Sequence, residues 1–145
     1  MLARIVRPNW GRLLGAALWV LALAAACTSR PQDALVGTWV ADLEATRQSP
    51  EFQALPAEQR PVAEQGLAIF ADARIDFTAE GRFAVVLPGM TEDGTYTVTK
   101  GDGETLVIHS TRSKDGKTKD IPAKARGDRL ALTLFGNSPA YFKRK

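Results

Sequence analysis

Cysteine and histidine, which supply most zinc ligands and many catalytic nucleophiles and bases, are nearly absent from this sequence. Its 145 residues include one cysteine, Cys27, and one histidine, His109. A disulfide within the chain needs two cysteines, so the apolar core must hold the fold together. The common zinc sites use several Cys or His ligands, and a nucleophile–base pair needs a partner that this sequence does not offer. We therefore expect no metal, no cofactor and no enzymatic activity.

A lasting excess of charge of one sign is also absent. The formal net charge is +3, but Arg4, Arg7 and Arg12 lie in the first 26 residues, which contain no acidic residue. The rest of the chain has 16 basic and 16 acidic residues. A protein that binds nucleic acid generally keeps a basic excess. We therefore expect no nucleic-acid partner.

The hydrophobic run near the N-terminus is too short to cross a membrane. Leu13–Ala26 follows the three arginines and has 14 residues, whereas a helix that spans a bilayer needs about 20. A basic segment followed by a short apolar run is typical of a cleavable export signal. We assign residues 1–26 to a signal peptide and expect the protein to be exported.

The residues around Cys27 resemble a known processing site. Ala24–Ala26 precede the cysteine and Leu23 lies just upstream, which resembles the lipobox of bacterial lipoproteins. The resemblance implies a lipid on Cys27, such as palmitate, and a membrane anchor. Thr28 stands where an Asp would retain such a protein in the inner membrane, which favours the periplasmic side of the outer membrane. An ordinary signal peptidase would cut the same bond and leave Cys27 unmodified.

Beyond Cys27 the sequence indicates one tethered domain. Residues 27–34 are polar around Pro31 and predict a tether. Residues 35–145 alternate between apolar and polar positions in short segments separated by turn residues, such as Asp115-Gly116. The strands are expected at about 35–43, 74–78, 83–87, 96–98, 106–108, 121–125, 130–134 and 141–142.

The connections between these segments decide the fold class. Residues 44–73 do not alternate, and we expect one helix there, from about Pro61 to Ala71, and a loop over Gly89–Gly94. The later connections are too short for a parallel crossover. Pro122 places its strand at an edge or bulge. Closure would remove exposed edges, so the sequence predicts a mainly β, antiparallel up-and-down barrel of about eight strands, with one helix inserted after the first.

Gly37-Thr38-Trp39, at the start of the first strand, resembles the Gly-x-Trp motif that opens lipocalins and the shorter lipocalin-like domains of bacterial lipoproteins. The resemblance implies that the indole closes one barrel end and that an Arg of the last strand, here Arg144, lies across it. The domain is shorter than a lipocalin, lacks its disulfide and has its helix after the first strand. These differences leave open whether the interior is large enough for a ligand.

Candidate site residues follow from the alternation. His109 lies opposite the inward Leu106 and Ile108 and is expected on the outer surface. Asp42 and Glu44 share a face at the end of the first strand and are expected to be solvated. The residues expected around an apolar ligand are Phe70, Phe77, Phe83, Tyr96 and Leu132.

Two functions fit this description. The first is a monomeric, membrane-anchored envelope lipoprotein whose lipocalin-like barrel binds a small apolar ligand. The alternative is a non-enzymatic envelope protein with a packed barrel, which acts on a protein partner in assembly or as an inhibitor and would expose an apolar patch.

Overall fold

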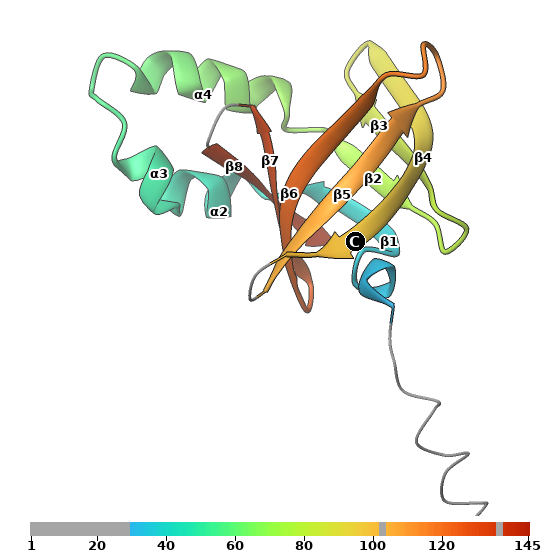
Figure 1. Ribbon diagram of the computed structural model, residues 1–145. Helices are drawn as coiled ribbons and strands as arrows, with labels where there is room; N and C mark the ends of the chain where they lie inside the picture. The colour runs from blue at the N-terminus through green and yellow to red at the C-terminus, as the bar shows by residue number, and fades with distance from the viewer. Residues whose placement is uncertain (1–29, 102–103, 136–137) are drawn as a thin grey trace, which may run out of the picture.

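The described part of the chain, residues 30–101, 104–135 and 138–145, forms eight antiparallel strands that close into a barrel in the computed structural model (Figure 1). Each strand pairs with the next along the chain, and the first pairs with the last. The predicted fold class is confirmed. The strands are β1 (Gly37–Ala41), β2 (Arg74–Phe77), β3 (Arg82–Leu87), β4 (Met90–Lys100), β5 (Thr105–Arg112), β6 (Thr118–Arg126), β7 (Arg129–Phe135) and β8 (Ser138–Arg144).

The alternation of the sequence becomes the inner and outer faces of the barrel. Opposite residues of neighbouring strands share a face, and the pairs Trp39–Ile75, Phe77–Phe83 and Ile108–Ile121 are inward. The buried core consists of Leu35, Trp39, Ala73, Ile75, Phe77, Tyr96, Leu106, Ile108, Ala123, Leu130, Leu132 and Phe142.

The loop expected over Gly89–Gly94 does not exist, because β4 begins at Met90 and its first six residues, Met90–Thr95, pair with β3. That prediction was wrong. A Cβ atom on Gly94 would lie 2.1 Å from the carbonyl oxygen of Thr111 and 2.7 Å from the Phe83 ring. The glycine therefore permits a close approach within the sheet, a role that glycine also has in strands.

Three short helices of the described chain lie between β1 and β2: α2 (Leu43–Gln48), α3 (Pro50–Gln53) and α4 (Arg60–Ile69). The helix expected at Pro61–Ala71 corresponds to α4. Asp42 is not a strand residue, because its carboxylate accepts a hydrogen bond from the Ala45 amide (3.1 Å) and caps α2, and Glu44 lies in the first turn of that helix. The expectation that these two residues share a strand face was wrong.

The two ends of the barrel differ. Pro31–Ala34, expected to be part of a tether, forms a 3₁₀ helix, η2, and Gln32 donates a hydrogen bond to the Ala79 carbonyl (3.0 Å). This helix lies at the end of the barrel opposite the β3–β4 and β5–β6 hairpins (Figure 1). The helices α2–α4 stand at the side of the barrel nearest β7 and β8 (Figure 1).

Candidate functional site

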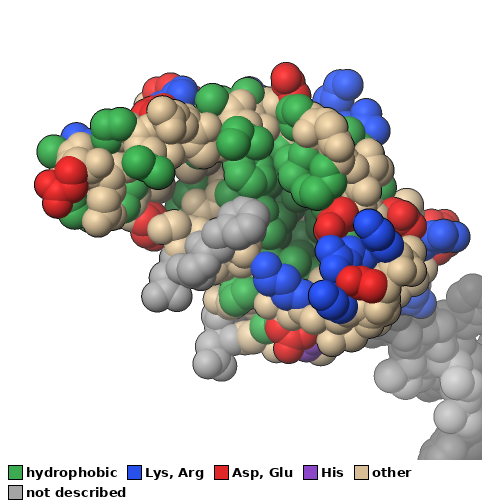
Figure 2. Space-filling model, turned by 90° about the horizontal axis from the view of Figure 1, so that it is seen from above, with side chains coloured by type: hydrophobic (Ala, Val, Ile, Leu, Met, Phe, Trp, Pro, Cys, Tyr) green, Lys and Arg blue, Asp and Glu red, His purple; other side chains and the backbone are tan. Residues whose placement is uncertain are grey.

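A cavity of about 470 Å³ opens between the β3–β4 and β5–β6 hairpins, at the end of the barrel away from η2. Seen from above, apolar side chains line the hollow (Figure 2). Its apolar lining consists of Phe70, Ile75, Phe77, Phe83, Val85, Leu87, Met90, Ile108, Ile121, Leu132 and Leu134. An eight-stranded barrel is just wide enough to be filled by its side chains or to hold one small ligand, and here the upper interior is not filled.

The residues expected around a ligand do not all lie at this cavity. Phe70, Phe77, Phe83 and Leu132 line it. Tyr96 is inward and buried but does not line the cavity, because its hydroxyl donates to the Thr78 carbonyl (2.9 Å) near the closed end. Its ring packs edge-on against Phe77, with 4.9 Å between the ring centroids.

The rim of the cavity is polar along β4, β5 and β6, which the sequence analysis missed. Glu92, Ser110, Arg112, Lys117, Thr118 and Lys119 complete the lining. The ladder between β5 and β6 continues beyond the pair Ile108–Ile121, with the pairs Ser110–Lys119 and Thr111–Thr118. Ile108 and Ile121 are inward by alternation. Counting two and four residues forward from Ile108 would have identified Ser110 and Arg112, and counting back from Ile121 would have identified Lys119 and Lys117.

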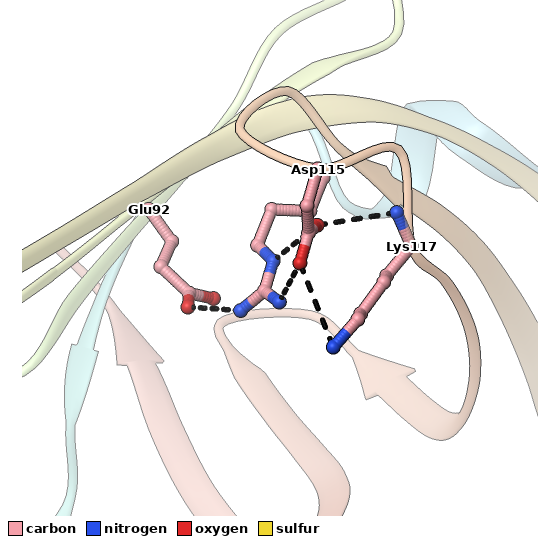
Figure 3. Close-up of polar contacts among 4 residues, drawn as sticks. Glu92, Asp115 and Lys117 are labelled. Atoms are coloured by element: carbon pink, nitrogen blue, oxygen red, sulfur yellow. Dashed lines mark hydrogen bonds and ion pairs between the residues drawn. The ribbon is translucent and has the colours of Figure 1, made fainter.

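Arg112 organises this rim. Its Nη1 donates to Glu92 Oε1 at 2.7 Å, and its Nε and Nη2 donate to the two oxygens of Asp115 (Figure 3). The hydrogen bond from Arg112 holds the pKa of Asp115 below its ordinary value, and the two carboxylates raise the pKa of Arg112. Lys117 Nζ lies 3.7 Å from Asp115 Oδ2. These contacts tie β4 to the β5–β6 hairpin at the mouth.

The opposite end is closed by Trp39 and Arg144. The indole is fully buried and its Nε1 donates to the Leu35 carbonyl (2.7 Å). The Arg144 guanidinium carbon lies 4.4 Å from the Trp39 ring centroid, a cation–π distance. Its nitrogens also donate to the carbonyls of Val36 (2.5 Å) and Ala34 (3.2 Å). Gly37, Trp39 and Arg144 therefore lie together at the barrel end farthest from the cavity mouth.

A second apolar pocket, of about 330 Å³, lies between the helices and β8. Phe70 and Leu134 line both this pocket and the barrel cavity, so the two spaces meet at these side chains. Leu67 faces the second pocket. Ile69, in the same helix, is 61% exposed and lines neither space.

His109 lies on the outer face of the barrel. Its Nδ1 contacts Asp120 Oδ1 at 2.7 Å and its Nε2 contacts the Thr99 hydroxyl at 2.9 Å. All three side chains are exposed or half-buried on the sheet surface, and none of them lines the barrel cavity. Among the described residues no group of three or more His, Cys, Asp and Glu side chains could hold a metal ion.

No protein-family profile and no curated protein matches the sequence. One solved structure is similar, a DUF4847 family protein from Bacteroides vulgatus, with a TM-score of 0.49 and 16% sequence identity over 77% of this chain and 94% of that chain. Within residues 30–101, 104–135 and 138–145, no helix has the length and hydrophobicity needed to span a bilayer. Cys27 and the expected signal peptide lie outside the described residues.

Proposed function

We propose that this protein is an exported, membrane-anchored lipoprotein whose barrel binds a small apolar ligand. The observation that carries the proposal is the cavity of about 470 Å³ inside the barrel. Ligand pockets are typically roughly 300–1,000 Å³ in volume and mostly apolar, with a few polar groups that orient the ligand. The cavity has this volume and this distribution, with aromatic and aliphatic walls below a polar rim.

The closed end supports this proposal on energetic grounds. A ligand gains roughly 25 cal/mol for each Å² of apolar surface removed from water, and water that entered from below would reduce that gain. Leu35 and Trp39 are fully buried at that end, and Arg144 covers the indole. The cavity therefore has an apolar floor, and its opening at the other end is partly polar.

The cavity also bears on the alternative, an envelope interaction protein with a packed barrel. That alternative requires side chains to fill the interior, and the space above Ile75 and Ile108 is open instead. One observation favours a protein partner: Val62 and Ile69, seven residues apart on α4, are 71% and 61% exposed. They share a helix face. This pair is the surface to test if the cavity binds nothing.

The ligand test uses the exported chain with Cys27→Ser, which prevents lipid attachment. Native mass spectrometry beside a denatured control would detect a mass that co-purifies and is lost on denaturation. Titration with the neutral fluorophore N-phenylnaphthylamine then measures uptake into an apolar site. We expect saturable binding.

Two matched variants place the site. Val85 lines the cavity, and Val86 follows it on β3 with its side chain on the other face. Val85→Trp would fill the cavity and is expected to weaken fluorophore binding at least about tenfold, equal to 1.4 kcal/mol. Val86→Trp should leave binding unchanged. Equal binding by both variants, each shown to be folded by circular dichroism, would contradict a site inside the barrel.

A further inference from the structure

We infer that the ligand is an anionic amphiphile, with its alkyl chain in the barrel cavity and its head group held at the rim by Lys117 and Lys119. This inference rests on the proposed function, because it assumes that the cavity binds an apolar chain. It adds the chemical class of the head group and the residues that select it.

The first argument is the register of the strands. Inward positions of β5 and β6 are apolar through the pair Ile108–Ile121 and then become polar at Ser110–Lys119. Lys117 lies just before β6, two residues from Lys119, and also lines the cavity. A barrel gains no core packing from charged side chains at inward positions, so the change of residue type at this level calls for another explanation.

The second argument is the charge of the rim. The charged residues among the described lining are three cations, Arg112, Lys117 and Lys119, and one carboxylate, Glu92. Counting Asp115, which contacts Arg112 and Lys117, still leaves three positive charges against two negative ones. Arg112 contacts both carboxylates, whereas Lys117 contacts only Asp115 of the two and Lys119 donates to the Leu134 carbonyl beside the mouth. Lys117 in particular is 75% exposed.

The third argument is the shape of the mouth. Phe70, Leu87, Met90 and Leu134 form apolar parts of the same lining, and charged side chains gather beside the apolar hollow (Figure 2). The mouth therefore presents an apolar surface and a cationic surface to one ligand. A molecule with an alkyl chain and an anionic head matches both.

The fourth argument is an opening beside the lysines. The β6–β7 ladder runs from Arg126–Arg129 to Ala123–Leu132 and does not continue toward the mouth, although β6 extends to Thr118 and β7 to Phe135. Pro122, which cannot donate a ladder hydrogen bond, lies next to the last pair. Lys119 Nζ donates to the Leu134 carbonyl (2.9 Å) across the separated strands. Lys119 therefore lies where β6 and β7 are no longer paired in the barrel wall.

Protection of this strand edge is the competing explanation for the lysines. Inward-pointing charges can keep an unpaired edge from joining another chain. That explanation predicts aggregation when the lysines are removed, and it predicts no preference for one head group over another. The two explanations therefore differ in a binding measurement.

The experiment measures displacement of N-phenylnaphthylamine from the exported Cys27→Ser chain by three ligands of equal chain length: dodecanoate, dodecanol and dodecyltrimethylammonium. An exposed ion pair strengthens binding by up to roughly fivefold. We therefore expect dodecanoate to bind roughly tenfold more tightly than dodecanol, and the cation to bind most weakly. Dodecyl phosphate should compete as dodecanoate does, since the site recognises an anion at the end of a chain.

Two double variants that remove the same charge test whether the head group lies at Lys117 and Lys119. Lys117→Gln with Lys119→Gln should remove the preference for dodecanoate while leaving dodecanol affinity unchanged, and the glutamine at 119 keeps a donor for the Leu134 carbonyl. The control, Lys124→Gln with Lys143→Gln, removes the same charge from exposed positions that do not line the cavity and should keep the preference. Each single rim variant, which perturbs the fold less, should show an intermediate preference.

The outcomes separate the two proposals. Equal affinity of the unmodified rim for dodecanoate and dodecanol would overturn the anionic head group and leave the apolar cavity site standing. The same loss of preference in the control variant would overturn the assignment to Lys117 and Lys119. Failure of every ligand and of the fluorophore to bind would instead overturn the proposed function.

Discussion

Gly37 shows how a single residue makes the closed end possible. Its φ is +133°, a backbone conformation that residues with a side chain rarely adopt. A Cβ atom there would lie 2.7 Å from Arg144 Nη1. The cation–π contact between Arg144 and Trp39, worth about 1 kcal/mol, therefore depends on the absence of a side chain two residues before the indole.

We predict that Gly37→Ala lowers the free energy of unfolding by roughly 1–3 kcal/mol, the usual cost of a strained backbone conformation. Urea unfolding followed by tryptophan fluorescence measures it, because Trp39 is the only tryptophan after residue 26. Gly66→Ala is the matched control. Gly66 lies in α4 with open space around its Cβ position, and alanine favours a helix. Equal loss of stability in both variants would contradict a specific role of Gly37.

Some contacts of single residues could be predicted from the sequence and others could not. Gly-Thr-Trp and Arg144 could be connected before the structure because a recurring motif relates them. Asp42 could not be assigned as a helix cap, because the alternation of β1 continues into it and the cap depends on where the strand ends. Tyr96 was rightly expected to be inward, but its hydroxyl bond to Thr78 is a three-dimensional contact that no local pattern specifies.

Among the elements, the β5–β6 hairpin carries the densest charge cluster at the mouth. Arg112 ends β5, Asp115 lies in the turn, and Glu92 belongs to β4. Because Arg112 donates to Asp115, the pKa of that carboxyl is lowered from its ordinary value of 3.8. The hairpin is thereby fastened to the neighbouring strand at the level of the cavity mouth.

We predict that Asp115 titrates below pH 3.8 in the folded protein, observed by NMR of its carboxyl carbon. A lowered folded-state pKa means that the stabilisation is present above the unfolded pKa and is lost as the pH falls through the folded one. Arg112→Gln should raise the Asp115 pKa toward 3.8 and remove that part of the acid dependence. An Asp115 midpoint that Arg112→Gln does not move would show that another group lowers it.

The sequence predicted that each strand exists, but it did not predict how long each strand is. Period-two alternation identified β2, β3, β5 and β7 from their apolar members. β4 was expected to begin near Tyr96 and instead begins at Met90, because Thr91–Asp93 and Gly94 carry no apolar alternation and their pairing with β3 is settled by the hairpin. The polar ends of β5 and β6, which form the rim, were not predicted either, because they also lack apolar alternation.

At the scale of the whole molecule, the barrel cavity and the pocket under the helices adjoin. They are about 470 and 330 Å³ in volume, and Phe70 and Leu134 stand between them. Phe70 directly follows α4, so the helical segment sets one wall of the barrel cavity. The sequence placed this segment after the first strand, but it contained no signal for a second pocket.

We predict that Phe70→Ala joins the two spaces and shifts the preferred ligand to a longer chain. The affinity for hexadecanol relative to dodecanol should rise several-fold, because each buried methylene contributes about 0.8 kcal/mol when it finds an apolar site. Displacement of N-phenylnaphthylamine measures the ratio. Phe52→Ala enlarges only the second pocket, since Phe52 does not line the barrel cavity. A ratio raised equally by both variants would contradict a partition at Phe70.

The pairing of β1 with β8 also has a consequence for the folding of the barrel. β1 meets β8 through Trp39–Arg144, Val40–Lys143 and Ala41–Phe142, and Lys145 donates to the Thr38 carbonyl. β1 therefore completes its pairing only when β8 is in place. Without β8 the sheet has two unpaired edges, β1 and β7, and unpaired edges are the parts of a folding β protein most prone to wrong pairing. Pairing of β8 with both strands removes these edges.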